Sequence, residues 1–386
     1  MLYNKSAVAN PVAETPEQLS FAERHSPFNL EAKTQEDIKS RVSPKLRGLN
    51  LVKRIVGVVH SNVIYKHNHD FKGGSRTADE TWHTGEGHCI EQGVLLYAAL
   101  KLFGFEPGFL MVKNPRGYDS GATGSFGVHP FMTLEFNGRT YLADAVPGDV
   151  KVKPLRDSFC VAEQPLTFRE AVAYFMMDRG DELGQYTDKF PEALSALETA
   201  LKIDPNNYTI HSTVAEVLTQ QKDFTAAEAA HRRAIRMVPN LLDPWKYLGD
   251  FFQDDRKNGR LGLVVYRDAL SRDTADFEIL QDIALQASAT YIFASFRNAQ
   301  LYRAMFNEYH DCDEAISLSK DVMESAASKF KEVIAKRRIP KAAVWKMLEK
   351  KQEFGAEYEK RIDEFNALCK QLNLKLSDSA LVEVRL

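Results

Sequence analysis

A period of 34 residues in the middle of the chain constrains its fold more than any other sequence feature. Residues 174–207 and 208–241 repeat this period. Their shared marks are two pairs of alanines and one pair of prolines: Ala193 and Ala227, Ala200 and Ala234, Pro205 and Pro239. Small residues at fixed places let two antiparallel helices approach closely, and a proline ends each unit. The period therefore predicts stacked helical pairs.

The second unit resembles a tetratricopeptide repeat (TPR). The matching positions are Val214, Ala215, Leu218, Phe224, Ala227, Ala234 and Pro239. A third, degenerate unit starts at Leu242 and lacks the final proline. Because about three units make a stable stack, we expect TPR-like repeats over 171–274 and a C-terminal helical region over 275–386. Such arrays present a concave groove that would hold a protein partner; alternatively, the helices only cap the preceding domain.

The stretch before the repeats predicts a buried helix that begins at a cysteine. Over residues 89–104, apolar side chains at helical spacing leave one narrow polar side, and Gly104 stands at the usual C-terminal stop. A helix N-terminus stabilises a thiolate, and its free amides can donate to an oxyanion. Cys89 is therefore a candidate nucleophile, with Gly85 and Gly87 allowing a sharp turn before it; the alternative is a buried structural thiol.

A hairpin further along the chain supplies a histidine and an aspartate. Period-two alternation runs into Asn137-Gly138, the strongest short hairpin signal, and the chain returns as a second strand. With a two-residue loop, Phe131 faces Asp144, and His129 lies on the same face two residues earlier. His129 and Asp144 would then be roughly 7–8 Å apart at the backbone, which suits an imidazole–carboxylate hydrogen bond.

Taken together, residues 80–147 resemble the transglutaminase-like superfamily, which is papain-like in topology. Residues 86–104 are similar to its nucleophile helix, and residues 129–144 to its histidine strand, turn and aspartate strand. The resemblance implies a triad of nucleophile, base and orienting group: Cys89, His129 and Asp144. Trp82 and His83, which lie six to seven residues before Cys89, are candidates for an oxyanion or cleft role.

The resemblance also implies thiol acyl transfer on a protein or peptide amide. Cys89 would attack the amide, a thioester would form, and water or a second amine would resolve it. Hydrolysis, as in a deamidase or protease, and cross-linking, as in a transglutaminase, differ only in what reaches the thioester. No cofactor or metal is implied. The alternative is a catalytically silent fold that serves as a TPR protein-binding adaptor.

These patterns predict an α+β papain-like, transglutaminase-core domain over 41–170, followed by the all-α repeat domain. Residues 1–40 are polar and contain three prolines, so we expect a disordered arm. A Gly- and Ser-rich loop of 14 residues, 114–127, precedes the histidine strand. Loops of this length are often functional, and we expect it to border the cleft and gate the acyl acceptor.

Net charge and cysteine spacing indicate which classes of partner and which cellular compartment to expect. Lys plus Arg total 50 and Asp plus Glu total 53, so a net charge of -3 gives no attraction to nucleic acid or anionic membrane. No apolar run approaches the roughly 18 residues that span a bilayer. Four widely spaced cysteines form no C-x-x-C pair. We therefore expect a cytoplasmic protein with neither a nucleic-acid nor a membrane partner.

Two polar groups bear a superficial likeness to metal ligands. The first is His67, His69 and Asp70, with His83 and His88 further on; the second is residues 310–314. The first group offers no helical i, i+4 pair and no thiolate cluster, so we expect a polar loop at the rim of the cleft and no metal. The second lies in a predicted helical region, where its side chains would point in different directions. The basic run 336–341 is interpreted as a solvated helix end.

Overall fold

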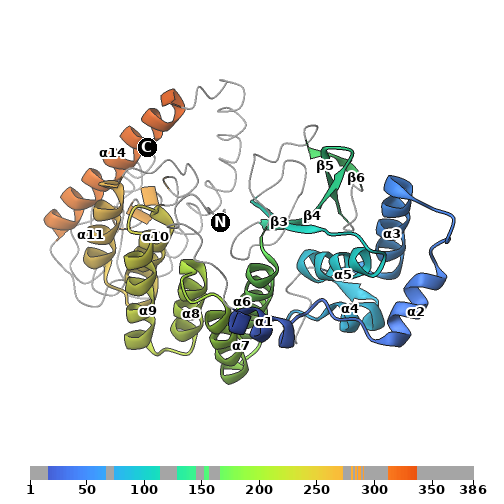
Figure 1. The fold of residues 1–386 in the computed structure, drawn as a ribbon. Helices are drawn as coiled ribbons and strands as arrows, with labels where there is room; N and C mark the ends of the chain where they lie inside the picture. Colours follow the sequence, from blue (N-terminus) through green and yellow to red (C-terminus); the bar gives the residue numbers. More distant parts are fainter. Residues whose placement is uncertain are drawn as a thin grey trace, which may run out of the picture. The chain divides into compact units, whose positions relative to one another are not determined.

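The computed structural model describes residues 16–66, 74–113, 128–144, 152–155, 166–272 and 312–336, and six single positions between 280 and 290. The chain divides into two compact units, Met1–Lys222 and Asp223–Leu386. Figure 1 draws the helices and strands with the labels used below. Most of the described part is helical, and the first unit also contains a four-stranded sheet. The two units are described separately below.

The N-terminal arm is helical from residue 16 onward, which corrects its expected disorder. Ala22 and Ile38 are fully buried in the core of the first unit. Each of these short helices has few apolar residues, so tertiary packing rather than local propensity stabilises it. Residues 1–15 lie outside the described part. The helices are α1 (Pro16–Arg24) and α2 (Ala32–Ser40).

The helix predicted to begin at the candidate nucleophile is α5 (Cys89–Leu102), which is buried on nearly all sides. The chain leaves it at Gly104, whose φ of 79° lies in the left-handed region that favours glycine. The helix α3 (Gly48–Asn62) packs beside α5 and is followed by the short strand β1 (Ile64–Tyr65). That strand pairs in parallel with β2 (Glu86–Gly87), which leads directly to α5.

The predicted hairpin is present with the predicted register. Asn137 and Gly138 have φ values of 50° and 69°, as a two-residue type I′ turn requires. Phe136 pairs with Arg139, and the ladder runs back to the pair of Met132 and Ala143. The antiparallel sheet has the order β3 (Gly108–Lys113), β4 (Val128–Phe136), β5 (Arg139–Ala143), β6 (Val152–Pro154).

The two faces of this sheet have different neighbours. Helix α5 covers one face: a Cβ atom on Gly93 would lie 3.0 Å from Cγ of Pro130 and 3.7 Å from Cε of Met132, so a glycine permits this close approach. On the other face, Phe131 packs in a separate apolar cluster with Leu142. The strand β4 therefore passes directly against the early part of the nucleophile helix.

Three helices complete the first unit, and they lie where the sequence predicts the start of the repeats. Close approach depends on glycines of α6: a Cβ on Gly180 would lie 2.6 Å from Cγ of Leu197, and one on Gly184 would lie 2.7 Å from Cγ2 of Val217. Apolar residues of these helices belong to the same continuous core as those of α5 and the sheet. The helices are α6 (Phe168–Tyr186), α7 (Phe190–Ile203) and α8 (Tyr208–Gln220).

The second unit continues with helices at the spacing that the repeats predict. Gly249 packs against the ring of Tyr266, and a Cβ at this position would lie 2.1 Å from its Cε1. The degenerate third unit is thus a close helix pair. The pair consists of α10 (Leu242–Asp250) and α11 (Gly259–Leu270), joined by the π-helix η4 (Phe251–Asp255). Further helices of this unit are α9 (Phe224–Met237) and α14 (Cys312–Lys336). Most of residues 275–386 lie outside the described part.

Candidate active site around Cys89

Cys89 is the first residue of α5 and is partly exposed. The preceding residue, His88, is buried and caps the helix with its own side chain: Nδ1 accepts a hydrogen bond of 3.2 Å from the Ile90 N–H. The carboxylate of Glu91 in turn accepts one of 3.0 Å from the His88 N–H. The N–H groups of His88 and Ile90 therefore already have acceptors, a feature that the sequence did not reveal.

The sheet brings the strand of His129 close to this helix end. Pro130 packs against Gly93, which lies one helical turn after Cys89. In the backbone ladder, His129 pairs with Val112 of β3. The side chain of His129 lies outside the described part, so its role as base stays a prediction.

Asp144 follows directly after β5 and is only 2% exposed. Continued alternation from Leu142 assigns it to the face of Phe131, whereas α5 covers the face of Pro130. A triad that includes Cys89 would therefore have to close around the end of the sheet rather than through it. The orienting role of Asp144 also stays a prediction.

The two residues expected at the oxyanion or cleft point toward α2. The indole N–H of Trp82 donates to Asp37 over 3.1 Å, and the Trp82 side chain is buried. The ring of His83 lies 3.2 Å from the hydroxyl of Thr34 and 3.5 Å from the carboxylate of Asp79. An oxyanion role for Trp82, which stays a prediction, would require its bond to Asp37 to break.

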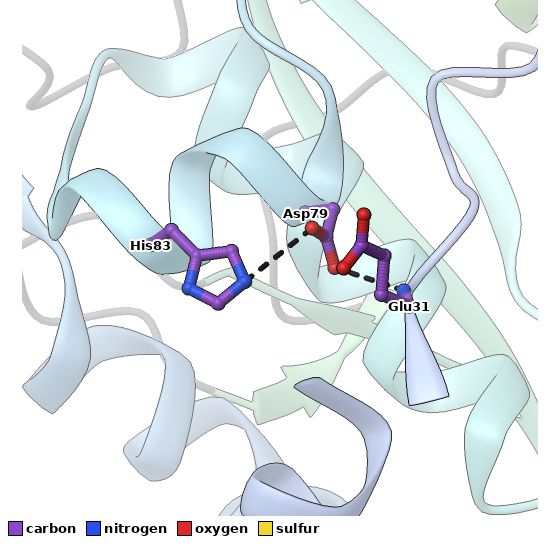
Figure 2. Close-up of side chains that lie close together, drawn as sticks. All are labelled: Glu31, Asp79 and His83. Atoms are coloured by element: carbon purple, nitrogen blue, oxygen red, sulfur yellow. Dashed lines mark hydrogen bonds and ion pairs between the residues drawn. The ribbon is translucent and has the colours of Figure 1, made fainter. Parts of the chain in front are cut away.

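Figure 2 shows His83 as one of three potential ligands that lie within 4.8 Å of one another: Glu31, Asp79 and His83. The Glu31 N–H donates to Asp79 over 2.9 Å. This contact ties the start of α2 to α4 (Ala78–Thr84). The group therefore has a structural explanation. His67, His69 and Asp70, expected to lie near it, are outside the described part, as is the loop 114–127.

A buried polar cluster next to Cys89 was not anticipated. His88 Nε2 lies 3.1 Å from Glu182 Oε1, and both side chains are buried. The hydroxyl of Ser75 lies 2.6 Å from Asp178 Oδ2 and 2.8 Å from Glu182 Oε2. Asp178 and Glu182 stand one turn apart on α6, far from His88 in the sequence. The i, i+4 carboxylates on an otherwise buried side of α6 were the signal that could have drawn attention to this helix.

The geometry of this cluster specifies where its protons are. One hydroxyl has one proton, so Ser75 cannot donate to both carboxylates, and one of them must be protonated. Burial, and then the charge of Glu182, raise the pKa of Asp178 well above its ordinary value. The consistent arrangement has Asp178 donating to Ser75 and Ser75 donating to Glu182.

The same cluster could hold a metal ion by composition, since the ligand atoms of His88, Asp178 and Glu182 lie within 4.8 Å of one another. The histidine does not fit that role. A metal on Nε2 would require the proton on Nδ1, but Nδ1 accepts from the Ile90 N–H. The neutral ring therefore carries its proton on Nε2, the nitrogen that lies 3.1 Å from Glu182 Oε1 and 3.4 Å from the Ser75 hydroxyl.

Comparison with known families supports the repeat region. Residues 187–245 match the tetratricopeptide repeat family, over a segment that runs from α7 into α10. Repeats of this kind commonly bind protein partners. No curated protein is similar enough to match the chain. In the described residues, no helix has both the length and the apolarity to cross a membrane. The family match does not reach Cys89, so the transglutaminase-like resemblance stays a prediction.

Proposed function

We propose that this chain is a cysteine-dependent acyltransferase or hydrolase that acts on amides of a protein held by its helical repeats. The contact of Pro130 with Gly93 carries the proposal, because it places β4 against α5 one helical turn from Cys89. Alternation along β4 assigns His129, like Asp144, to the face of Phe131, so the proposed triad would close around the end of the sheet. The partial exposure of Cys89 at a helix N-terminus supports it, since that position favours a reactive thiolate.

In the proposed reaction, Cys89 Sγ attacks the carbonyl carbon of a side-chain or backbone amide. The amide nitrogen leaves as ammonia or an amine and takes its proton from the imidazolium, while the acyl group stays on sulfur as a thioester. Water or a second amine then attacks the thioester carbonyl carbon and gives its proton to the imidazole. The C–S bond breaks, the acyl product leaves, and the Cys89 thiolate and the imidazolium are regenerated. Hydrolysis and cross-linking share every step before this one.

A second candidate function is that of an adaptor in which the first domain is catalytically silent. The N–H groups of His88 and Ile90 favour it, because both donate within the helix cap rather than toward an incoming oxyanion. In this case the repeats alone would carry the function, by binding a protein partner.

The two functions differ in whether a covalent adduct forms at Cys89. The full chain would be incubated with cell extract and quenched in acid, which preserves thioesters, and acylated Cys89 peptides would be sought by mass spectrometry. Cys89→Ala should bind the same proteins without any adduct. Cys312→Ala should form the adduct as the wild type does. Equal binding by all three proteins with no adduct would favour the adaptor.

A further inference from the structure

Helix α6, which the sequence assigns to the start of the repeat region, reaches directly into the surroundings of the candidate nucleophile. Glu182 of α6 contacts His88, and Arg179 of the same helix donates to the Ser75 carbonyl over 3.1 Å. The chain before Ser75 is fitted to this helix as well: a Cβ on Gly74 would lie 2.8 Å from Cγ of Leu183. The contact between α6 and the segment that leads to Cys89 is therefore tight and polar.

A buried imidazole and carboxylate are costly unless they serve each other. His88 caps α5, but an asparagine would cap a helix at least as well without needing a buried carboxylate. Helix capping thus explains the position of His88 and leaves Glu182 unexplained. Two other neighbours can use the ring: the Ser75 hydroxyl, 3.4 Å from Nε2, and the side chain of the adjacent Cys89, which raises the pKa of His88. Of these two, Cys89 is the one that the proposed reaction uses.

We infer that Cys89 has a second imidazole partner, His88, and that Glu182 positions this ring and balances its charge. The inference rests on the proposed function, because it assigns a further catalytic residue to the same nucleophile. Cys89, His88 and Glu182 then form a cysteine–histidine–carboxylate chain whose last member belongs to the repeat region.

The proton transfer within this chain is specific. The neutral ring carries its proton on Nε2, so the proton that leaves Sγ goes to Nδ1. The thiol becomes a thiolate and the ring becomes an imidazolium, while the Glu182 carboxylate keeps its charge at 3.1 Å from Nε2. The Ile90 N–H loses its acceptor in this step, and as a helix N-terminal amide it favours the negative charge that has appeared on sulfur.

The surrounding charges favour this ion pair. Burial lowers the pKa of His88, but the Glu182 carboxylate and the bond to Cys89 raise it, and the net direction is upward. Glu91 is paired with Arg76, whose N–H donates to it over 2.7 Å. The titratable or charged groups facing the pair from β1, α5, α6 and the segment before α4 are Tyr65, Arg76, Glu91, Tyr174, Asp178 and Glu182.

The test is the pH dependence of Cys89 alkylation by iodoacetamide in the full chain, followed by mass spectrometry. Glu182→Gln removes the charge and keeps the shape, so the pH of half-maximal rate should rise by about one unit and the rate near pH 6 should fall about tenfold. His88→Asn keeps an N-cap and removes the ring, so it should give a similar shift. The double variant should be no worse than either single one. Glu198→Gln, at an exposed position of α7, is the matched control and should leave the profile unchanged.

The outcomes separate this inference from the proposed function. If the wild-type Cys89 reacts rapidly and neither Glu182→Gln nor His88→Asn moves its profile, the inference is wrong and the proposed function stands. If the wild-type Cys89 reacts no faster than the other cysteines, both are wrong. If Glu182→Gln proves unstable by circular dichroism, His88→Asn alone decides, since its cap preserves the helix.

Discussion

Glu182, on the helix α6 that directly precedes the matched repeats, lies 3.1 Å from the ring of His88, the residue before the candidate nucleophile. The two residues belong to segments that the sequence assigns to different domains. Their contact means that α6, the helix next to the matched repeats, is part of the structure around Cys89. A partner that shifted α6 would therefore act directly on the residue next to the thiol.

The protonation of Asp178 can be tested through stability. If the partly buried Asp178 holds a proton, as its raised pKa and its contact with Ser75 indicate, Asp178→Asn should change the free energy of unfolding by less than about 1 kcal/mol. Asp178→Ala leaves Ser75 without this partner and should cost about 1–3 kcal/mol. Urea unfolding at pH 7 compares the two. A large loss in Asp178→Asn with a small loss in Asp178→Ala would place the proton elsewhere.

The contact between α6 and α7 predicts that one added methyl group lowers the free energy of unfolding. In Gly180→Ala the added Cβ would lie 2.6 Å from Leu197 Cγ and 2.9 Å from the Ala193 carbonyl oxygen. We expect a loss of about 1–3 kcal/mol in urea unfolding, because a backbone atom cannot move aside cheaply. The matched control is Gly57→Ala in α3, which meets no atom within 4 Å. It should gain about 0.5–1 kcal/mol from lower chain entropy.

The shared core predicts where the chain can be cut. A fragment of residues 1–222 should fold and unfold in one cooperative transition, because its apolar core is continuous from α1 to α8. A fragment of residues 1–167 should aggregate, since removal of α6 exposes the apolar surface that Val172 and Phe175 cover. Circular dichroism and size-exclusion chromatography compare the two. A soluble, folded 1–167 fragment would contradict the single core.

Stability of the second unit should fall in mild acid because of His231. Burial lowers the pKa of His231 from its ordinary 6.5 to about 4, so the folded state binds fewer protons than the unfolded state between these values. Its contribution is complete above pH 6.5 and is lost as the pH falls toward 4, by up to about 3 kcal/mol.

His231→Leu should remove this part of the pH dependence. Asp255, whose pKa burial raises to about 6, acts in the opposite direction but is present in both proteins, so it cancels in the comparison. Unfolding midpoints measured from pH 7.5 to 4 provide the test. Parallel curves for the two proteins would show that His231 does not titrate in this way.

Local patterns predicted the elements that hold the site. The apolar stripe ending at Gly104 predicted α5, and the Asn137-Gly138 turn predicted both the hairpin and its register. These features depend on neighbours in the sequence or on one short turn. The helices α1 and α2 were missed because their burial depends on partners from the whole unit.

The cluster around His88 could not be predicted for a different reason. His88 and Glu182 meet only after α6 has packed on the first domain, and nothing in either local sequence specifies the other. His83 and His88 were grouped as one polar rim, yet His83 lies with Asp79 and His88 with Glu182. Sequence proximity was misleading here because α4, which contains His83, ends at Thr84, and the left-handed Gly85 turns the chain before it reaches His88.

The central claim is that Cys89 is an activated nucleophile, and its alkylation rate tests this most directly. The wild-type chain would be treated with a small excess of iodoacetamide, and the labelling of Cys89, Cys160, Cys312 and Cys369 followed by mass spectrometry. We predict that Cys89 reacts at least about tenfold faster at pH 7, with a half-maximal rate well below the value of about 8.5 for a free thiol. Equally slow labelling of all four cysteines would contradict the account and leave a protein-binding adaptor.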